Sequence, residues 1–200
     1  SLLLSQGKTE KADAILRQTP HNTIEPSQEP TGVFRSLGDW HLIHHRWKAA
    51  AECYQLLPMA NRFIPEEIIS DTGDTIRTAP ALVLAGMDAA YEQHRLALIE
   101  RYATATTHNP VEQAVKMSLL EPAPPEVLER LRPMVAFLKH HADTVTLRGY
   151  AETDPNRFNR SEPRDIESPR MHILTNTAIA LYELRCGNPA AATQRTDRAL

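Results

Sequence analysis

Histidines offer the first candidate chemistry in this chain. His41 and His45 are four residues apart, and two imidazoles at that spacing on one helix face can hold a single metal ion. A metal site needs three or four convergent ligands, and no third ligand is evident nearby. We therefore interpret these histidines as a solvated helix end. A ligand- or metal-binding helical domain that uses the His41/His45 face is the alternative.

Acidic and nucleophilic side chains give weaker signals. The run Asp71-Thr72-Gly73-Asp74 is similar to acidic motifs of cation sites and aspartic proteases, but it occurs once and no apolar strands flank it. This predicts a cap or bend within a helical segment. The chain has no G-x-S-x-G elbow, no glycine-rich phosphate loop, and no His-Arg-Asp or Asp-Phe-Gly motif. We therefore predict a protein that is not an enzyme and needs no cofactor.

Composition limits the class of protein. Hydrophobic residues make up 42% and charged residues 24% of the chain, as in ordinary globular domains. A net charge of −3 without a basic stripe argues against nucleic acid as a partner. The apolar run 79–87 contains a proline and is too short to span a membrane. Cys53 and Cys186 have no CxxC partner, so we expect two buried thiols in a soluble, cytoplasmic protein.

One short pattern returns four times along the sequence. A turn residue is followed five positions later by a small or aromatic residue that could pack against the preceding helix. The pairs are Gly7 with Ala12, His45 with Ala50, Gly86 with Tyr91, and Gly187 with Ala192. The first three turns are 38 and 41 residues apart, a period typical of arrays of helix pairs. The pattern predicts an all-α solenoid, residues 1–200, of antiparallel helix pairs.

The expected helices follow from apolar periodicity and from the prolines. They cover residues 2–6 with 10–18, 33–44 with 47–57, 66–85 with 87–102, 110–120, 126–141, and 170–186 with 189–200. Pro80 should kink or split the third of these pairs. We predict a polar linker over 19–30 and a long loop or insert over 149–169. Both chain ends lie within expected helices, which indicates a fragment of a longer protein.

Aromatic residues are expected in the core rather than at a ligand. Six of them fall at helical positions that should face a neighbouring helix: Trp40, Trp47, Tyr54, Tyr91, Tyr102 and Tyr182. If the ring of Trp47 is buried, replacing it with alanine should cost about 3–5 kcal/mol of stability.

The chain also resembles a known family. The residues that carry the resemblance are Gly38-Asp39-Trp40, Arg46 to Ala50, Ala81 to Gly86, Tyr91-Glu92, Arg101-Tyr102 and Ala114 to Pro122. They are similar to the tetratricopeptide-like region found carboxy-terminal to serine/threonine kinase domains in planctomycete and verrucomicrobial bacteria. The resemblance spans residues 33–137 and 171–200, although His45 stands where the turn glycine is usual. It implies a tetratricopeptide-like α-solenoid with a groove for other chains.

The sequence thus favours a non-catalytic scaffold for protein–protein interaction, the regulatory or targeting part of a larger bacterial signalling protein. Its partner would be a protein or peptide, or the rest of its own chain, and neither nucleic acid nor membrane. Self-association through exposed helix faces at the chain ends is a further possibility. Because the first helix of each pair usually lines the groove, Arg35, Asp39 and His41 are the partner-binding candidates.

Overall fold

The protein is all-helical over the residues described by its computed structural model, which are 2–63, 73–144 and 169–199. These three stretches contain α-helices and short 3-10 helices, with no β-strand among them. The predicted all-α class is confirmed. The chain divides into two compact units, residues 1–98 and 99–200.

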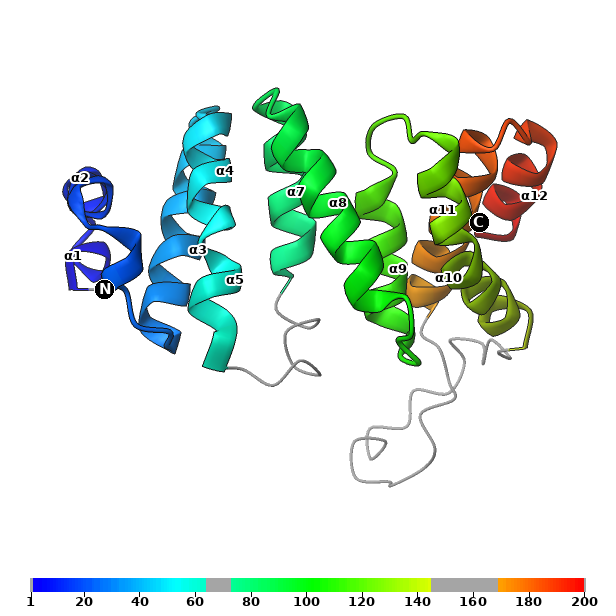
Figure 1. Cartoon of the computed structure of the whole chain (residues 1–200), viewed down its shortest axis with the longest axis horizontal. Helices are drawn as coiled ribbons and strands as arrows, with labels where there is room; N and C mark the ends of the chain where they lie inside the picture. Colours follow the sequence, from blue (N-terminus) through cyan, green and yellow to red (C-terminus); the bar gives the residue numbers. More distant parts are fainter. Residues whose placement is uncertain (1, 64–72, 145–168, 200) are drawn as a thin grey trace, which may run out of the picture. The chain divides into compact units, whose positions relative to one another are not determined.

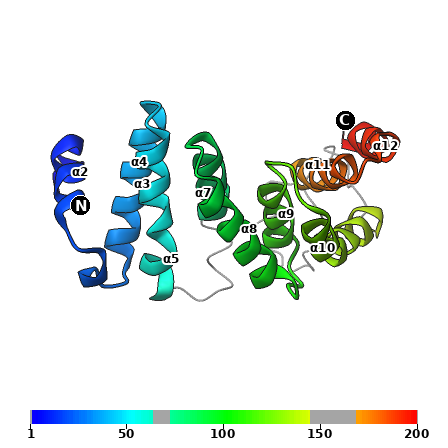
Figure 2. The same ribbon diagram turned by 45° about the horizontal axis from the view of Figure 1, so that its top comes forward.

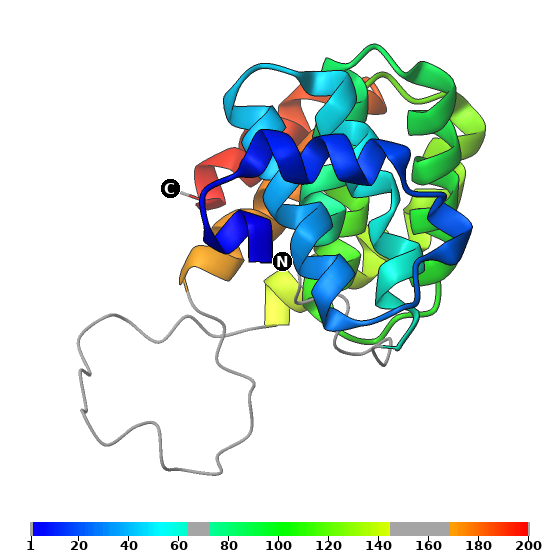
Figure 3. The same ribbon diagram turned by 90° about the vertical axis from the view of Figure 1, so that its left-hand side faces the viewer.

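The first unit is a succession of helices, each packed on the next. Its elements are α1 (Leu2–Ser5), α2 (Thr9–Gln18), η1 (His21–Thr23), α3 (Gln28–Ile43), α4 (Trp47–Gln55), α5 (Leu57–Ala60), η2 (Asn61–Phe63), α7 (Asp74–Leu84) and the start of α8 (Asp88–Tyr102). α1 packs on α2, α2 on α3, α3 on α4, and α4 on α7 (Figures 1 and 2). In Figure 3, α2 crosses in front of α3.

The described part of the second unit contains the end of α8 and four further helices. These are α9 (His108–Ser118), α10 (Pro125–Thr144), α11 (Pro169–Arg185) and α12 (Pro189–Ala199). α9, α10 and α11 pack on one another, and α12 packs along α11. The buried side chains at this three-helix contact are apolar, among them Val115, Leu131, Leu138 and Ile179.

The four predicted turns share one backbone geometry. At Gly86 (φ 63°) the Gly86 amide donates to the Val83 carbonyl, and the Met87 amide donates to the Leu82 carbonyl, both at 3.0 Å. This is a Schellman helix end, in which a residue in the left-handed conformation allows two carbonyl groups near the end of the helix to accept hydrogen bonds. The same pair of bonds occurs at the three other turn residues, Gly7, His45 and Gly187, where φ is 70°, 56° and 77°. The turn prediction is confirmed at all four positions.

A glycine allows α3 and α4 to approach closely. A Cβ atom built on Gly38 would lie 2.2 Å from the Cε1 atom of Tyr54. The Tyr54 ring therefore occupies the space that any other residue at position 38 would fill, and both residues are fully buried. Ala50 and Ala51 continue this contact along α4, also without exposed surface. Small residues thus set the spacing of this pair, as the sequence predicted.

Several predicted boundaries need correction. The linker predicted over 19–30 is shorter, because η1 interrupts it and α3 already begins at Gln28. Pro30 lies in the first turn of α3, where an amide has no helical partner to lose. Pro80 does not split α7, which runs unbroken and is held by the buried neighbours Ala79 and Ala81. The start of the helix expected near residue 66 lies outside the described residues, among which α7 begins at Asp74. The insert predicted over 149–169 also lies outside them, apart from its last residue.

The predicted core is right for the tyrosines and wrong for the tryptophans. Four tyrosines are buried: Tyr54, Tyr91, Tyr102 and Tyr182. Trp40 and Trp47 are only partly buried, because they flank the α3–α4 turn at the surface of the unit. Cys53 is buried as expected, but Cys186 is exposed because it directly precedes the turn residue Gly187. Among the described helices, none combines the length and apolar character needed to cross a bilayer.

The turn geometry predicts opposite effects of one substitution at two glycines. Gly86→Ala forces a Cβ into the left-handed region and should destabilise the protein by about 1–2 kcal/mol. No heavy atom would contact a Cβ added at Gly86 or at Gly32, so only the backbone conformation differs between the two sites. Gly32→Ala, in the interior of α3, should instead stabilise by about 0.5–1 kcal/mol. Urea unfolding followed by circular dichroism measures both, and equal shifts would contradict the turn assignment.

Candidate functional site

Arg35, the first predicted partner-binding residue, is held by an ion pair inside the first unit. Its Nε donates to Oδ1 of Asp74 at 2.7 Å, and its Nη2 donates to Oδ2 at 2.9 Å. The pair is bidentate, the strongest geometry for an arginine and a carboxylate. It connects α3 with the first turn of α7, so Arg35 positions helices rather than standing ready for a partner.

The same carboxylate anchors a small buried network. The Nδ2 atom of Asn61 donates to Asp74 at 2.6 Å, and the Thr31 hydroxyl lies 2.8 Å from Oδ1 of Asn61. Asn61, Thr31 and Asp74 are 2%, 3% and 7% exposed. Gly73 precedes the helix in the left-handed conformation (φ 69°). The sequence correctly placed a cap or bend here, but it gave no sign that Arg35 and Asn61 bind the Asp74 carboxylate.

Asp39, the second candidate, lies at the edge of the α3–α4 contact. The hydroxyl of Tyr54 donates to its Oδ1 at 2.6 Å, and Nε of Arg77 lies 3.4 Å from the same oxygen. Burial, together with the Asp39 carboxylate, raises the pKa of Tyr54 well above its usual value. Asp39 is half exposed, with 46% of its side chain accessible. A partner could therefore reach Asp39, but its carboxylate also accepts a hydrogen bond that joins α3 to α4.

His41, the third candidate, is a correction. Its side chain is 1% exposed, and its Nε2 lies 2.9 Å from Oδ1 of Asp13 on α2. Arg17 donates to the other oxygen of Asp13 at 3.0 Å. Burial opposes ionisation of Asp13, but the hydrogen bonds from His41 and Arg17 outweigh it and lower its pKa. His41 therefore fastens α2 to α3 and does not line an accessible surface.

The two histidines of the metal alternative face different surroundings. His41 is buried against Asp13, whereas His45 is exposed in the turn and places its ring edge-on to Trp47, with centroids 5.1 Å apart. Within the described stretches, no group of three His, Cys, Asp or Glu side chains converges as a metal site would require. The arrangement gives the pair no shared third ligand there. Nearby, burial raises the pKa of the Cys53 thiol to about 12, which leaves it unreactive.

An apolar groove lies between the first helix pair and α3 in the first unit. It has a volume of about 460 Å³. Its walls are Leu2, Leu3 and Leu4 of α1, Ala12, Ile15, Leu16 and Thr19 at α2, Ile24 and Glu25 of the connection, and Glu29, Pro30, Val33 and Phe34 of α3. Leu2 and Ile15 are 69% and 49% exposed despite their apolar side chains. The groove's only charged lining residues are Glu25 and Glu29. We call this feature the apolar groove.

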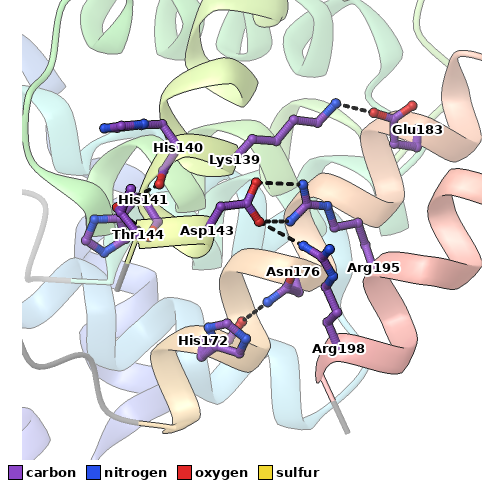
Figure 4. A network of polar contacts seen from close by, with 10 residues as sticks. All are labelled: Lys139, His140, His141, Asp143, Thr144, His172, Asn176, Glu183, Arg195 and Arg198. Atoms are coloured by element: carbon purple, nitrogen blue, oxygen red, sulfur yellow. Dashed lines mark hydrogen bonds and ion pairs between the residues drawn. The ribbon is translucent and has the colours of Figure 1, made fainter. Parts of the chain in front are cut away.

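Ion pairs fasten the last three helices of the second unit (Figure 4). Asp143 on α10 accepts hydrogen bonds from Arg195 at 2.9 Å and Arg198 at 2.8 Å, both on α12. The bond from Arg195 lowers the pKa of Asp143. Lys139 of α10 pairs with Glu183 of α11. These contacts join charges of opposite sign on different helices.

A histidine also joins α9 to α11. Thr175 donates its hydroxyl hydrogen to the Met171 carbonyl at 2.8 Å and lies 2.6 Å from Nε2 of His108. Because that hydrogen is already used, Nε2 of His108 must be the donor in the second bond. The His108 ring stacks on His141 of α10, with centroids 4.4 Å apart. Burial, and then the neighbouring His141 and Lys116, lower the pKa of His108 to about 4.

Comparison with known proteins gives no relative for this chain. No protein-family model matches it, and neither a curated protein nor a solved structure is significantly similar.

The Asp74 network predicts a structural role for Arg35. Arg35→Ala removes both guanidinium bonds from a buried carboxylate and should lower the free energy of unfolding by about 2 kcal/mol. Arg62→Ala, which changes an exposed arginine of η2, should stay within about 0.5 kcal/mol of the wild type. Denaturant unfolding measures both variants. If Arg35→Ala were as stable as the wild type, the structural role of Arg35 would be contradicted, and the residue would remain a candidate for partner binding.

The His108 contact predicts acid sensitivity. Its pKa of about 4 lies below the ordinary value of 6.5, so the unfolded chain binds a proton more readily. The contribution of neutral His108 to the stability of the folded protein is therefore complete above pH 6.5 and is lost as the pH falls toward 4. His94, whose pKa burial also lowers to about 4, adds a slope of the same sign. His108→Gln keeps an N–H donor and removes the titration.

We therefore expect His108→Gln to flatten the decline of unfolding midpoint between pH 7 and pH 4.5, when urea titrations are followed by circular dichroism. His140→Gln, a change at an exposed neighbour of His141, serves as the control and should follow the wild-type profile. A His108→Gln profile as steep as that of the control would contradict the assignment.

Proposed function

We propose that this chain is a tetratricopeptide-like helical repeat that works as a non-catalytic protein-interaction module. Four helix ends with the same left-handed turn support the repeat, as does the sequential packing from α1 to α7. In such arrays each pair contacts its neighbours only, and grooves between successive helices take segments of other chains. The family resemblance extends the proposal to a regulatory or targeting part of a cytoplasmic bacterial signalling protein.

The apolar groove is the observation that carries this proposal. Exposed leucine and isoleucine side chains that gather around a cavity of about 460 Å³ are typical of a surface that another molecule covers. An amphipathic helix lays its apolar side chains into such a groove. We assign the groove to a peptide segment of a partner protein that presents apolar anchors for this surface.

The charge of the groove defines the rest of its partner. The described lining of the groove includes the exposed Glu25 and contains no lysine or arginine. The Glu25 carboxylate at this margin favours a lysine or arginine next to the apolar anchors of the peptide, because complementary charge selects partners and speeds their encounter. The proposed ligand is therefore an apolar segment flanked by basic residues.

Selection from a displayed library of random peptides tests this function. We expect the wild-type chain to enrich peptides that combine apolar anchors with lysine or arginine. Ile15→Asp places a charge on the groove wall and should weaken the selected peptides at least about tenfold, which corresponds to 1.4 kcal/mol. Ile76→Asp is the matched control, because Ile76 is 44% and Ile15 49% exposed but only Ile15 lines the groove.

Two results would contradict the groove assignment. The first is a selection that enriches no peptide above background with the folded wild-type chain. The second is a set of peptides that bind Ile15→Asp as tightly as they bind the Ile76→Asp control. Circular dichroism of both variants checks that each retains the wild-type helix content before binding is compared.

A further inference from the structure

A second cleft lies at the α3–α4 turn, beside the chain's only two tryptophans. It has a volume of about 430 Å³ and is lined by Arg17, Arg46, Trp47, Lys48, Ala49 and Glu52. None of these residues lines the apolar groove. We call this feature the tryptophan cleft.

Cations outnumber carboxylates in the tryptophan cleft. Arg17, Arg46 and Lys48 face a single lining carboxylate, Glu52, and that carboxylate lies 3.7 Å from Arg17. Among the described residues, no carboxylate lies within ion-pair distance of Arg46 or Lys48, both of which are exposed. The first turn of α4 contains no acidic residue either. The cleft therefore has positive charge that its own described surroundings do not neutralise.

Stacking on the Trp40 ring holds the side chain of Arg46 in position. The guanidinium carbon of Arg46 lies 4.3 Å from the centroid of the Trp40 ring. A guanidinium over an indole face keeps its N–H donors at the ring edge free to bind an anion. Arg17 is ordered in a different way, by its hydrogen bond to Asp13 at 3.0 Å. An anion that enters would thus meet a preorganised arginine, which reduces the entropy lost on binding.

Trp47 supplies an apolar wall beside these cations. Its ring is partly exposed and meets His45 edge-on, with an interplanar angle of 79°. Tryptophan and arginine dominate the binding energy of protein interfaces, because they combine a large apolar area with directed polar contacts. A ligand that fits must therefore carry negative charge and an apolar group together.

We propose that the tryptophan cleft binds an acidic peptide segment of a protein partner. Aspartate or glutamate carboxylates pair with Arg46 and Lys48, and an adjacent apolar side chain packs on Trp47. An acidic peptide suits this cleft better than a nucleic acid, because Glu52 would repel a continuous phosphate backbone and the chain has a net charge of −3. The tryptophan cleft is separate from the apolar groove, and it prefers an acidic peptide whereas the groove prefers a basic one.

Intrinsic fluorescence reports on this cleft, because Trp47 lines it and Trp40 stacks on its Arg46. The probe is a short acetylated peptide of glutamates around one phenylalanine, also labelled for fluorescence anisotropy. We expect a saturable change in tryptophan emission, a matching anisotropy curve, and weaker binding at higher salt. The same peptide with lysines in place of glutamates, and an oligothymidylate of equal charge, should give no such change.

Charge reversal locates the binding. Arg46→Glu combined with Lys48→Glu should weaken the acidic peptide at least about tenfold. Lys11→Glu combined with Arg130→Glu makes the same change in net charge at exposed positions outside the cleft and should stay within about twofold of the wild type. Ile15→Asp should also leave this binding unchanged, so failure of the groove assignment and failure of this one are distinguishable.

Three outcomes would overturn the proposal. They are a wild-type chain that gives no saturable signal in either readout, a control pair that loses as much affinity as the cleft pair, and an oligothymidylate that binds as tightly as the acidic peptide. Circular dichroism confirms that each variant is folded before it is titrated.

Discussion

Four helix pairs in the described part of the chain each depend on one residue in the left-handed conformation at the turn between their helices. That residue reverses the chain and lets the last carbonyls of the first helix accept hydrogen bonds, so the second helix can return along the first. Glycine meets the requirement without strain at three of the four turns, and His45 meets it with a Cβ at φ 56°. The strained turn lies between Trp40 and Trp47, and both of these residues are partly exposed beside it. Strain of this kind concentrates at functional sites in other proteins.

Buried polar pairs then fix how successive pairs meet. Asp13 with His41 joins α2 to α3, and Asp74 with Arg35 joins α7 to α3, at distances of 2.9 Å and 2.7 Å. Each pair has one partner that is nearly inaccessible, so removal of the other would leave a buried polar group without its hydrogen bond. These contacts use the side chains that α3 turns toward its neighbours. The apolar groove and the tryptophan cleft are two surfaces that remain accessible in the described part of this unit.

Local sequence rules predicted the helices and their turns but not the accessibility of single side chains. Gly7, His45, Gly86 and Gly187 were identifiable because a Schellman turn is set by neighbouring residues. Trp47 was placed in the core because helical periodicity gives the face of a helix and not the depth at which that face lies. Local rules place His41 and Arg35 at the surface, because their partners are 28 and 39 residues away in the sequence. Only the fold brings such partners together, and the tryptophan cleft depends on the same long-range placement of Arg17.

We propose that the first unit recognises a peptide through the apolar groove. Hydrogen–deuterium exchange of the whole chain, with and without a peptide selected on the wild-type protein, tests this most directly. Added protection in α1, α2 and the first two turns of α3, with no change in α10 or α12, is the result that the account predicts. Protection confined to α10 and α12, with the apolar groove exchanging as before, would contradict it.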